Sequence, residues 1–276
     1  LGTMTAYIAR KLDTNEMGRI IVPGNNRAVT NAVSWFMAII LFTVLINMTA
    51  ACGAMVNQLF GISPMIGGVL IAVLVVATVL GEFHRISKVF KFVMPVLFAA
   101  VVIISIAVIF SVEKTAVDPE NLKPSPIAGN WILAACLYIS YNILAMIPIV
   151  ATSSVNAKSE KTALIGSGLG GIFLGVLALV IVKALQSDMS FAQDADMPML
   201  AYSMRVNSAV GITYAVILFA AIYSSATSNF YGFTTKIKDG PFKNRLVICA
   251  AATAFVLGLV GFKNVVAYMF PIEGYL

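Results

Sequence analysis

The chain has 276 residues, of which 60% are hydrophobic and only 11% are charged, and its mean hydropathy is +0.94. Because a soluble globular domain carries about 25% charged residues, this composition excludes an ordinary soluble protein. The net charge of +6 comes from loop residues that form no basic stripe interleaved with aromatic side chains, so we expect no nucleic-acid partner.

Seven apolar runs are each long enough, as helices, to cross the ~30 Å hydrocarbon core of a bilayer. Two shorter apolar segments, 1–9 and 264–276, fit partial helices, and we expect the chain to be truncated at both ends. The sequence therefore predicts an all-α polytopic transmembrane bundle, with the lipid bilayer as its partner, that forms a single domain over 1–276. The seven predicted spans are 29–51, 65–81, 92–112, 130–153, 162–187, 206–233 and 245–262.

The loops between these runs alternate in charge, and this alternation predicts the orientation. Cationic loops stay on the cytoplasmic side of a membrane. Thirteen of the 18 Lys and Arg residues lie on one side, in loops 10–27, 82–91, 154–161 and 234–245, which we predict to be cytoplasmic. The opposite side holds Lys114, Lys123, Lys183, Arg205 and Lys263, and its loops are mildly acidic, with Glu113, Asp118, Glu120, Asp188, Asp194 and Asp196.

The first span carries polar residues that must be satisfied inside or at the edge of the membrane. Asn47 and Thr49 lie within it, and Asn57 and Gln58 follow near its outer end. Such side chains either line a polar cavity or form hydrogen bonds between helices, and the sequence leaves both interpretations open.

The span at 130–153 combines a polar cluster with a proline. Ser140, Tyr141 and Asn142 lie near its middle and Pro148 follows six residues later. Proline removes one backbone donor and clashes one turn back, so this pattern can encode a discontinuous helix that binds a solute. A continuous, proline-kinked helix is the alternative interpretation.

Glycines in the span at 162–187 form the pattern G-x-G-x-x-G through Gly166, Gly168 and Gly171. A dinucleotide site would need a preceding strand and a downstream acidic residue. Because these glycines lie inside a membrane helix, with Gly175 adding a small-xxx-small step, close helix packing is the better interpretation.

The span at 206–233 contains five hydroxyl groups and one amide between Tyr223 and Asn229. Serine and threonine oxygens can coordinate Na⁺, and they can also bond the carbonyl one turn back on their own helix. A run of this density favours an ion-binding or cavity-facing surface.

One carboxylate, Glu273, lies about ten residues into the last partial helix. An ionisable residue at membrane depth is a functional candidate, and proton coupling is its natural role. Elsewhere the sequence offers neither metal-ligand spacing nor a nucleophile–base pair, so we expect no enzyme, no metal centre and no cofactor beyond Na⁺ or H⁺ as a coupling ion.

Three stretches carry a resemblance to a known family: LYISYNILAMIP at 137–148, FAAIYSSATSNFYGF at 219–233 and NVVAYMFPIEGYL at 264–276. Through these stretches and its span order, the chain resembles the YkvI-like conserved membrane proteins of bacteria, and through them the leucine-transporter fold of the amino acid–polyamine–organocation superfamily. That fold contains two inverted repeats of five helices. The resemblance implies that the seven spans are helices three to nine and that the protein lies in the bacterial inner membrane.

The resemblance also implies roles for particular residues. In such transporters helices one and six are broken and hold the substrate, while sodium binds between helix one carbonyls and helix eight hydroxyls. The implied substrate-binding residues are Ser140, Tyr141 and Asn142. The implied ion-binding residues are Ser224, Ser225, Thr227 and Ser228, and Glu273 is the proton-coupling candidate.

These observations predict a secondary transporter of a small organic solute, such as an amino acid, coupled to Na⁺ or H⁺ and working by alternating access. A non-transporting sensor or assembly subunit is the main alternative. A channel is another, although its polar residues would extend along several helices rather than cluster near mid-membrane. The sequence leaves the oligomeric state open.

Overall fold

The computed structural model describes residues 1–14, 16–22, 26–81, 83–112 and 126–276, with the backbone only at 83–91. Within these ranges the chain is helical and contains no strand, which confirms the predicted all-α class. The basic side chains of the predicted cytoplasmic loop 82–91, and the external residues Lys114 and Lys123, lie outside what the structure describes.

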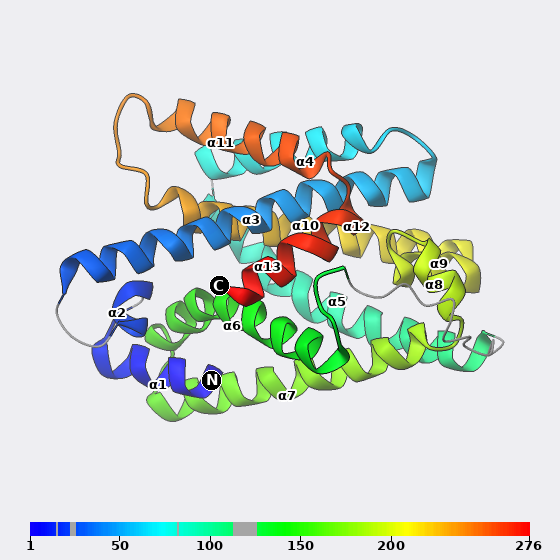
Figure 1. Ribbon diagram of the computed structural model, residues 1–276, viewed down its shortest axis with the longest axis horizontal. Helices are drawn as coiled ribbons and strands as arrows, with labels where there is room; N and C mark the ends of the chain where they lie inside the picture. The colour runs from blue at the N-terminus through cyan, green and yellow to red at the C-terminus, as the bar shows by residue number, and fades with distance from the viewer. Residues whose placement is uncertain (15, 23–25, 82, 113–125) are drawn as a thin grey trace. The chain divides into compact units, whose positions relative to one another are not determined.

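Figure 1 shows the helices of the described residues in chain order. Their bounds are α1 Gly2–Leu12, α2 Met17–Ile21, α3 Arg27–Phe60, α4 Pro64–Leu80, α5 Phe83–Ser111, α6 Trp131–Val155, α7 Glu160–Leu185, α8 Met189–Asp194, α9 Pro198–Val206, α10 Ser208–Thr234, α11 Lys243–Gly258, α12 Phe262–Asn264, the π-helical turn η2 Val265–Met269, and α13 Phe270–Tyr275.

Among the described residues, five helices are long and apolar enough to cross a membrane: α3, α5 from Phe92, α6, α7 and α10. Helix α11 and the helical segment that follows it count as a sixth crossing if they form one span, although the chain bends by 94° between them. Helix α4 is apolar but shorter, at 17 residues. The chain is therefore a multi-pass membrane protein, and each predicted apolar run coincides with one of these helices.

The bend after α11 differs from the sequence prediction, which extended one helix over 245–262. Helix α11 ends at Gly258, and Gly261 adopts a positive φ of 96° before α12 begins. Glycine accepts this left-handed conformation without the steric cost that a side chain would bring. Further on, η2 ends two residues before Pro271, which lacks the amide donor that an α-helical turn would use.

The chain separates into two compact units. Unit 1 comprises Leu1–Leu41, Ile127–Val176 and Met269–Leu276, and unit 2 comprises Phe42–Pro126 and Leu177–Tyr268. Helices α3 and α7 each begin in unit 1 and end in unit 2. We describe each unit by itself, and the single transmembrane domain expected from the sequence remains a prediction, as does the leucine-transporter inverted repeat.

In unit 1, α1 and α13 both pack on α6. The guanidinium of Arg10 donates a hydrogen bond of 3.0 Å to the carbonyl oxygen of Val155 at the end of α6. This bond brings loops 10–27 and 154–161 to the same end of unit 1, as the charge pattern predicts. Near the same end, the amide of Gly18 donates to Ser34 Oγ at 3.2 Å.

In unit 2, glycines allow α3 to approach α4 and α11 closely. A Cβ added at Gly53 would lie 2.7 Å from the carbonyl oxygen of Pro64, and one added at Gly258 would overlap Thr49 Oγ1. Such close approach is the usual means of packing membrane helices, because lipid provides no hydrophobic driving force between them. Thr49 Oγ1 also donates to the carbonyls of Ile46, at 2.8 Å, and Ala254, at 3.3 Å.

Candidate functional site

The candidate site in unit 1 lies where α13 packs on α6, which run side by side in Figure 1. The two backbones meet closely, since a Cβ added at Gly274 would lie 2.7 Å from the carbonyl oxygen of Leu137. The rings of Tyr141 on α6 and Phe270 on α13 are stacked, with centroids 4.7 Å apart and planes 8° apart. Tyr138 extends this aromatic cluster with an edge-on contact to Tyr141 at 5.5 Å.

Glu273 is buried in this contact, with 5% of its surface exposed. It lies within electrostatic range of the Tyr141 hydroxyl. A carboxyl group among apolar helices is costly as an isolated anion, so it is held either as the neutral acid or against a positive partner. The α6–α13 contact can therefore exchange a proton or hold a cation at Glu273.

The structure brings together two groups of residues that the sequence analysis treated separately. Tyr141, from the predicted substrate cluster, and Glu273, the proton-coupling candidate, belong to the same helix contact. Ser140 and Asn142, the sequence neighbours of Tyr141, are half-buried on α6. The side-chain amide of Asn142 donates to the carbonyl oxygen of Tyr138 on its own helix at 2.7 Å.

The predicted break in this helix is wrong. Helix α6 runs continuously from Trp131 to Val155, through Ser140–Asn142 and through Pro148. The alternative interpretation, an unbroken helix containing a proline, fits the structure. The backbone groups of the polar cluster therefore remain within the helix, and only its side chains are available for other contacts.

The predicted ion-binding residues lie on α10 in unit 2, and they differ in burial. Ser224 and Thr227 are 3% and 0% exposed and share a buried face. Ser225 is half-buried, and its carbonyl accepts a hydrogen bond of 2.8 Å from Asn229. Ser228 is exposed. Only two of the four candidates are thus buried together.

Three buried polar side chains of unit 2 make no hydrogen bond within the described part of the chain: Asn47 on α3, Ser105 on α5 and Thr227 on α10. Leaving a buried donor or acceptor unsatisfied costs about 1–3 kcal/mol. Such groups are candidates for an internal water or ion. By contrast, Thr49 and Gln58 form hydrogen bonds between elements, as one of the two open interpretations expected.

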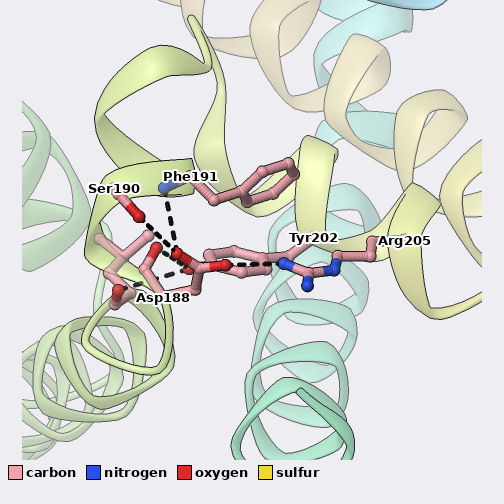
Figure 2. A network of polar contacts seen from close by, with 6 residues as sticks. Asp188, Ser190, Phe191, Tyr202 and Arg205 are labelled. Atoms are coloured by element: carbon pink, nitrogen blue, oxygen red, sulfur yellow. Dashed lines mark hydrogen bonds and ion pairs between the residues drawn. The ribbon is translucent and has the colours of Figure 1, made fainter. Parts of the chain in front are cut away.

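A polar network between α7 and α9 was not predicted from the sequence (Figure 2). Asp188 caps α8 by accepting from the Phe191 amide at 3.2 Å, and it also accepts from Ser190 Oγ at 2.9 Å. Arg205 on α9 donates to Asp188 Oδ2 at 2.9 Å and lies over the Phe191 ring. The Arg205 guanidinium holds the pKa of Asp188 below its ordinary value.

Tyr202 completes this network from the buried side. Its hydroxyl donates to the carbonyl oxygen of Asp188 at 2.6 Å. Burial raises the pKa of Tyr202 above its ordinary value, so the hydroxyl remains a donor at neutral pH. The network fixes α8 and α9 to each other at the end of α7.

Two further side chains hold the connector between α8 and α9. The Gln58 side chain forms two hydrogen bonds with the Met197 backbone, accepting at 2.9 Å and donating at 3.1 Å. The Lys263 ammonium donates to the carbonyls of Gln193 and Asp194 at 3.1 and 2.8 Å, and it lies 3.6 Å from Asp196. These contacts place Gln58, Lys263 and the acidic connector together at one end of unit 2.

The glycine pattern on α7 is not used for tight packing among the described residues. No heavy atom there lies within 4 Å of a Cβ added at Gly166, Gly170, Gly171 or Gly175. Only Gly168 has a neighbour, the Thr3 methyl group at 3.6 Å. Among the described residues, the predicted close helix packing is therefore wrong for Gly166, Gly171 and Gly175, which face open space.

Comparison with known proteins supports a membrane-protein family. The chain is 22% identical, over 282 residues, to YkvI, an uncharacterized membrane protein of Bacillus subtilis, covering 100% of this chain and 79% of that protein. It is also 22% identical over 238 residues to YyaD, an uncharacterized protein of the same organism, covering 86% of this chain and 68% of that protein. No protein-family model and no solved structure matches the chain.

Proposed function

We propose that this protein is a secondary transporter of a small organic solute, amino-acid-like in its chemistry, that couples transport to H⁺ or Na⁺ by alternating access. In this proposal it lies in the bacterial inner membrane with loops 10–27, 82–91, 154–161 and 234–245 in the cytoplasm, where the cationic residues favour retention. Coupling to an ion gradient fits a chain whose sequence has no nucleotide-binding motif.

The observation that carries this proposal is the buried carboxyl of Glu273 in the α6–α13 contact. An ionisable group at membrane depth is unfavourable for stability, and a proton or solute pathway is the common reason for one. The stacked Tyr141 and Phe270 rings beside it supply a flat apolar surface, while Ser140 and Asn142 supply hydrogen-bonding groups. This combination suits a small solute with one polar and one apolar part.

For sodium coupling, the structure favours Ser224 and Thr227 over Ser225 and Ser228. Sodium is bound by several oxygen ligands shielded from water, and only the first two hydroxyls are buried. Thr227 Oγ1 makes no hydrogen bond among the described residues, so its oxygen is available to an ion.

The test is uptake of radiolabelled amino acids into proteoliposomes under an imposed pH or Na⁺ gradient, with Glu273→Gln as the variant. We expect the wild type to accumulate solute with an inward proton gradient, and the variant to lose the dependence on pH because glutamine cannot take up a proton. Glu160→Gln is the matched control, since Glu160 is exposed at the start of α7.

The same uptake assay distinguishes a transporter from a sensor, an assembly subunit or a channel. Saturable solute binding without uptake would assign the protein to sensors or assembly subunits and overturn the proposal. Flux that never exceeds the equilibrium distribution under any gradient would point to a channel. An unchanged pH profile in Glu273→Gln would remove Glu273 from the coupling mechanism.

A further inference from the structure

A groove of about 530 Å³ lies between α1, α6 and the first half of α7, entirely within unit 1. Its lining is predominantly apolar along most of its length. Met146 lies toward one end beside Gly2, and Gly166, Gly170 and Gly171 line the α7 side. Because a Cβ at any of these three α7 glycines would meet open space, the groove is hollow where a membrane helix would normally present side chains.

The other end of the groove is polar. Ser153 and Ser154, in the last turn of α6, both line it. Ser154 is 3% exposed, and neither hydroxyl makes a hydrogen bond within the described part of the chain. Both hydroxyls line the groove and are therefore free to donate a hydrogen bond to a molecule bound there.

This polar end is also cationic. Ser154 is followed by the loop that carries Lys158 and Lys161, both exposed, and Arg10 is held there by its bond to Val155. Glu160, in the first turn of α7, is the nearby carboxylate, so this end of the groove is bordered by three basic residues and one acidic residue. A ligand for this end carries oxygen acceptors and negative charge.

The two ends of the groove are separated along the axis of α6. Met146 precedes Ser154 by eight residues, which corresponds to about 12 Å along α6 at 1.5 Å per residue. Gly2 likewise precedes Arg10 by eight residues of α1. Because Gly2 lies near Met146, α1 and α6 extend in the same direction from the apolar end of the groove to its polar end. An apolar channel that extends about 12 Å from a cationic, hydroxyl-bearing end matches a phospholipid rather than a compact solute.

We propose that this groove binds one anionic phospholipid. Its phosphate and ester oxygens accept hydrogen bonds from Ser153 and Ser154 and lie near Lys158, Lys161 and Arg10, and one acyl chain lies on the glycine surface of α7. Basic recesses between transmembrane helices commonly hold such headgroups. This site is independent of the proposed transport function, because it uses none of the residues assigned to solute or ion.

The test places the purified protein in nanodiscs of equal parts phosphatidylglycerol and phosphatidylethanolamine, and native mass spectrometry then counts the lipids that remain bound. We expect the wild type to retain one phosphatidylglycerol. Gly170→Leu fills the groove and displaces about two methylene groups of the chain, which should lower retention about tenfold. Gly175→Leu is the matched control, because Gly175 also faces open space on α7 but does not line the groove.

A second pair of variants tests the headgroup. Lys158→Gln with Lys161→Gln should lower the preference for phosphatidylglycerol about fivefold per lysine, since each cation near the surface contributes to binding anionic lipid. Lys236→Gln with Lys238→Gln, in another basic loop, should leave it unchanged. The proposal is overturned by equal retention in Gly170→Leu and Gly175→Leu, or by equal retention of the two lipids in the wild type. It is likewise overturned if Gly170→Leu dissociates a dimer without changing bound lipid, because a second copy would then occupy the groove.

Discussion

Replacing Asp188 should loosen the segment from α8 to α9 without disturbing the membrane helices. The carboxylate caps α8, bonds Ser190 and pairs with Arg205. Losing an N-cap costs about 1 kcal/mol. Because the Arg205 side chain is 45% exposed, the ion pair is screened and contributes about 1 kcal/mol at most. Asp188→Ala should therefore lower the free energy of local opening by about 2 kcal/mol.

Hydrogen–deuterium exchange of the 188–206 amides in detergent measures this opening directly. Asp188→Asn should lose only about 1 kcal/mol, because asparagine also caps a helix but cannot pair with Arg205. Asp239→Ala removes another ion pair, with Lys243, in which the acid is 93% exposed, and it should have almost no effect. The reasoning fails if Asp188→Ala and Asp188→Asn exchange at the same rate, or if Asp239→Ala accelerates exchange as much.

The pH dependence of this segment follows from the lowered pKa of Asp188. A carboxyl whose pKa is lower in the folded state contributes stability above its unfolded pKa, and the contribution is lost as pH falls through the folded value. Protection of the α8 and α9 amides should thus be constant from neutral pH down to the ordinary aspartate value of 3.8 and decline below it. Asp188→Asn should abolish this decline, and a decline that persists in the variant would assign it to another group.

Three further outcomes are expected. Gly258→Ala should destabilise the protein by about 1–3 kcal/mol in thermal unfolding, because its Cβ would overlap Thr49 Oγ1, whereas Gly240→Ala, in open space, should not. Lys263→Met should release the α8–α9 connector and accelerate exchange at 193–197, with Lys238→Met as the unaffected control. Thr227→Val should raise thermal stability in the absence of Na⁺ by about 1 kcal/mol, because it removes an unsatisfied hydroxyl. The same variant should reduce any stabilisation by Na⁺. Ser228→Ala, which alters an exposed residue, should change neither the stability nor the effect of Na⁺.

The sequence predicts the helices of this protein well because their signals are local. Apolar runs long enough to cross a bilayer coincide with helices, and Asn130 and Asn207 cap α6 and α10 through their own side chains. Predictions that depended on how a residue packs in the tertiary structure were less reliable. Pro148 is compatible with either a break or a continuous helix, and the sequence contains nothing that decides between them.

Polar contacts between residues far apart in the sequence could not be predicted for the same reason. Asp188 and Arg205 are 17 residues apart, and Gln58 and Met197 are 139 apart. No periodicity in the sequence links either pair, because both depend on how α8 and α9 fold against the ends of other helices. The acidic loop and the exposed arginine were visible as charges, but their pairing follows only from the tertiary structure.

Hydrogen-bond satisfaction, rather than residue type, separates structural from functional candidates in this membrane protein. Thr49 and Gln58 are polar and lie at membrane depth or its edge, yet each bonds a neighbouring element. Ser154 and Thr227 are equally ordinary residues, but both are buried residues whose hydroxyls make no hydrogen bond in the described structure. Since the hydrocarbon tails of lipid cannot supply the missing partner, a bound polar group or ion is needed, and this is why the groove at Ser154 and the buried face at Thr227 are the places to look for ligands.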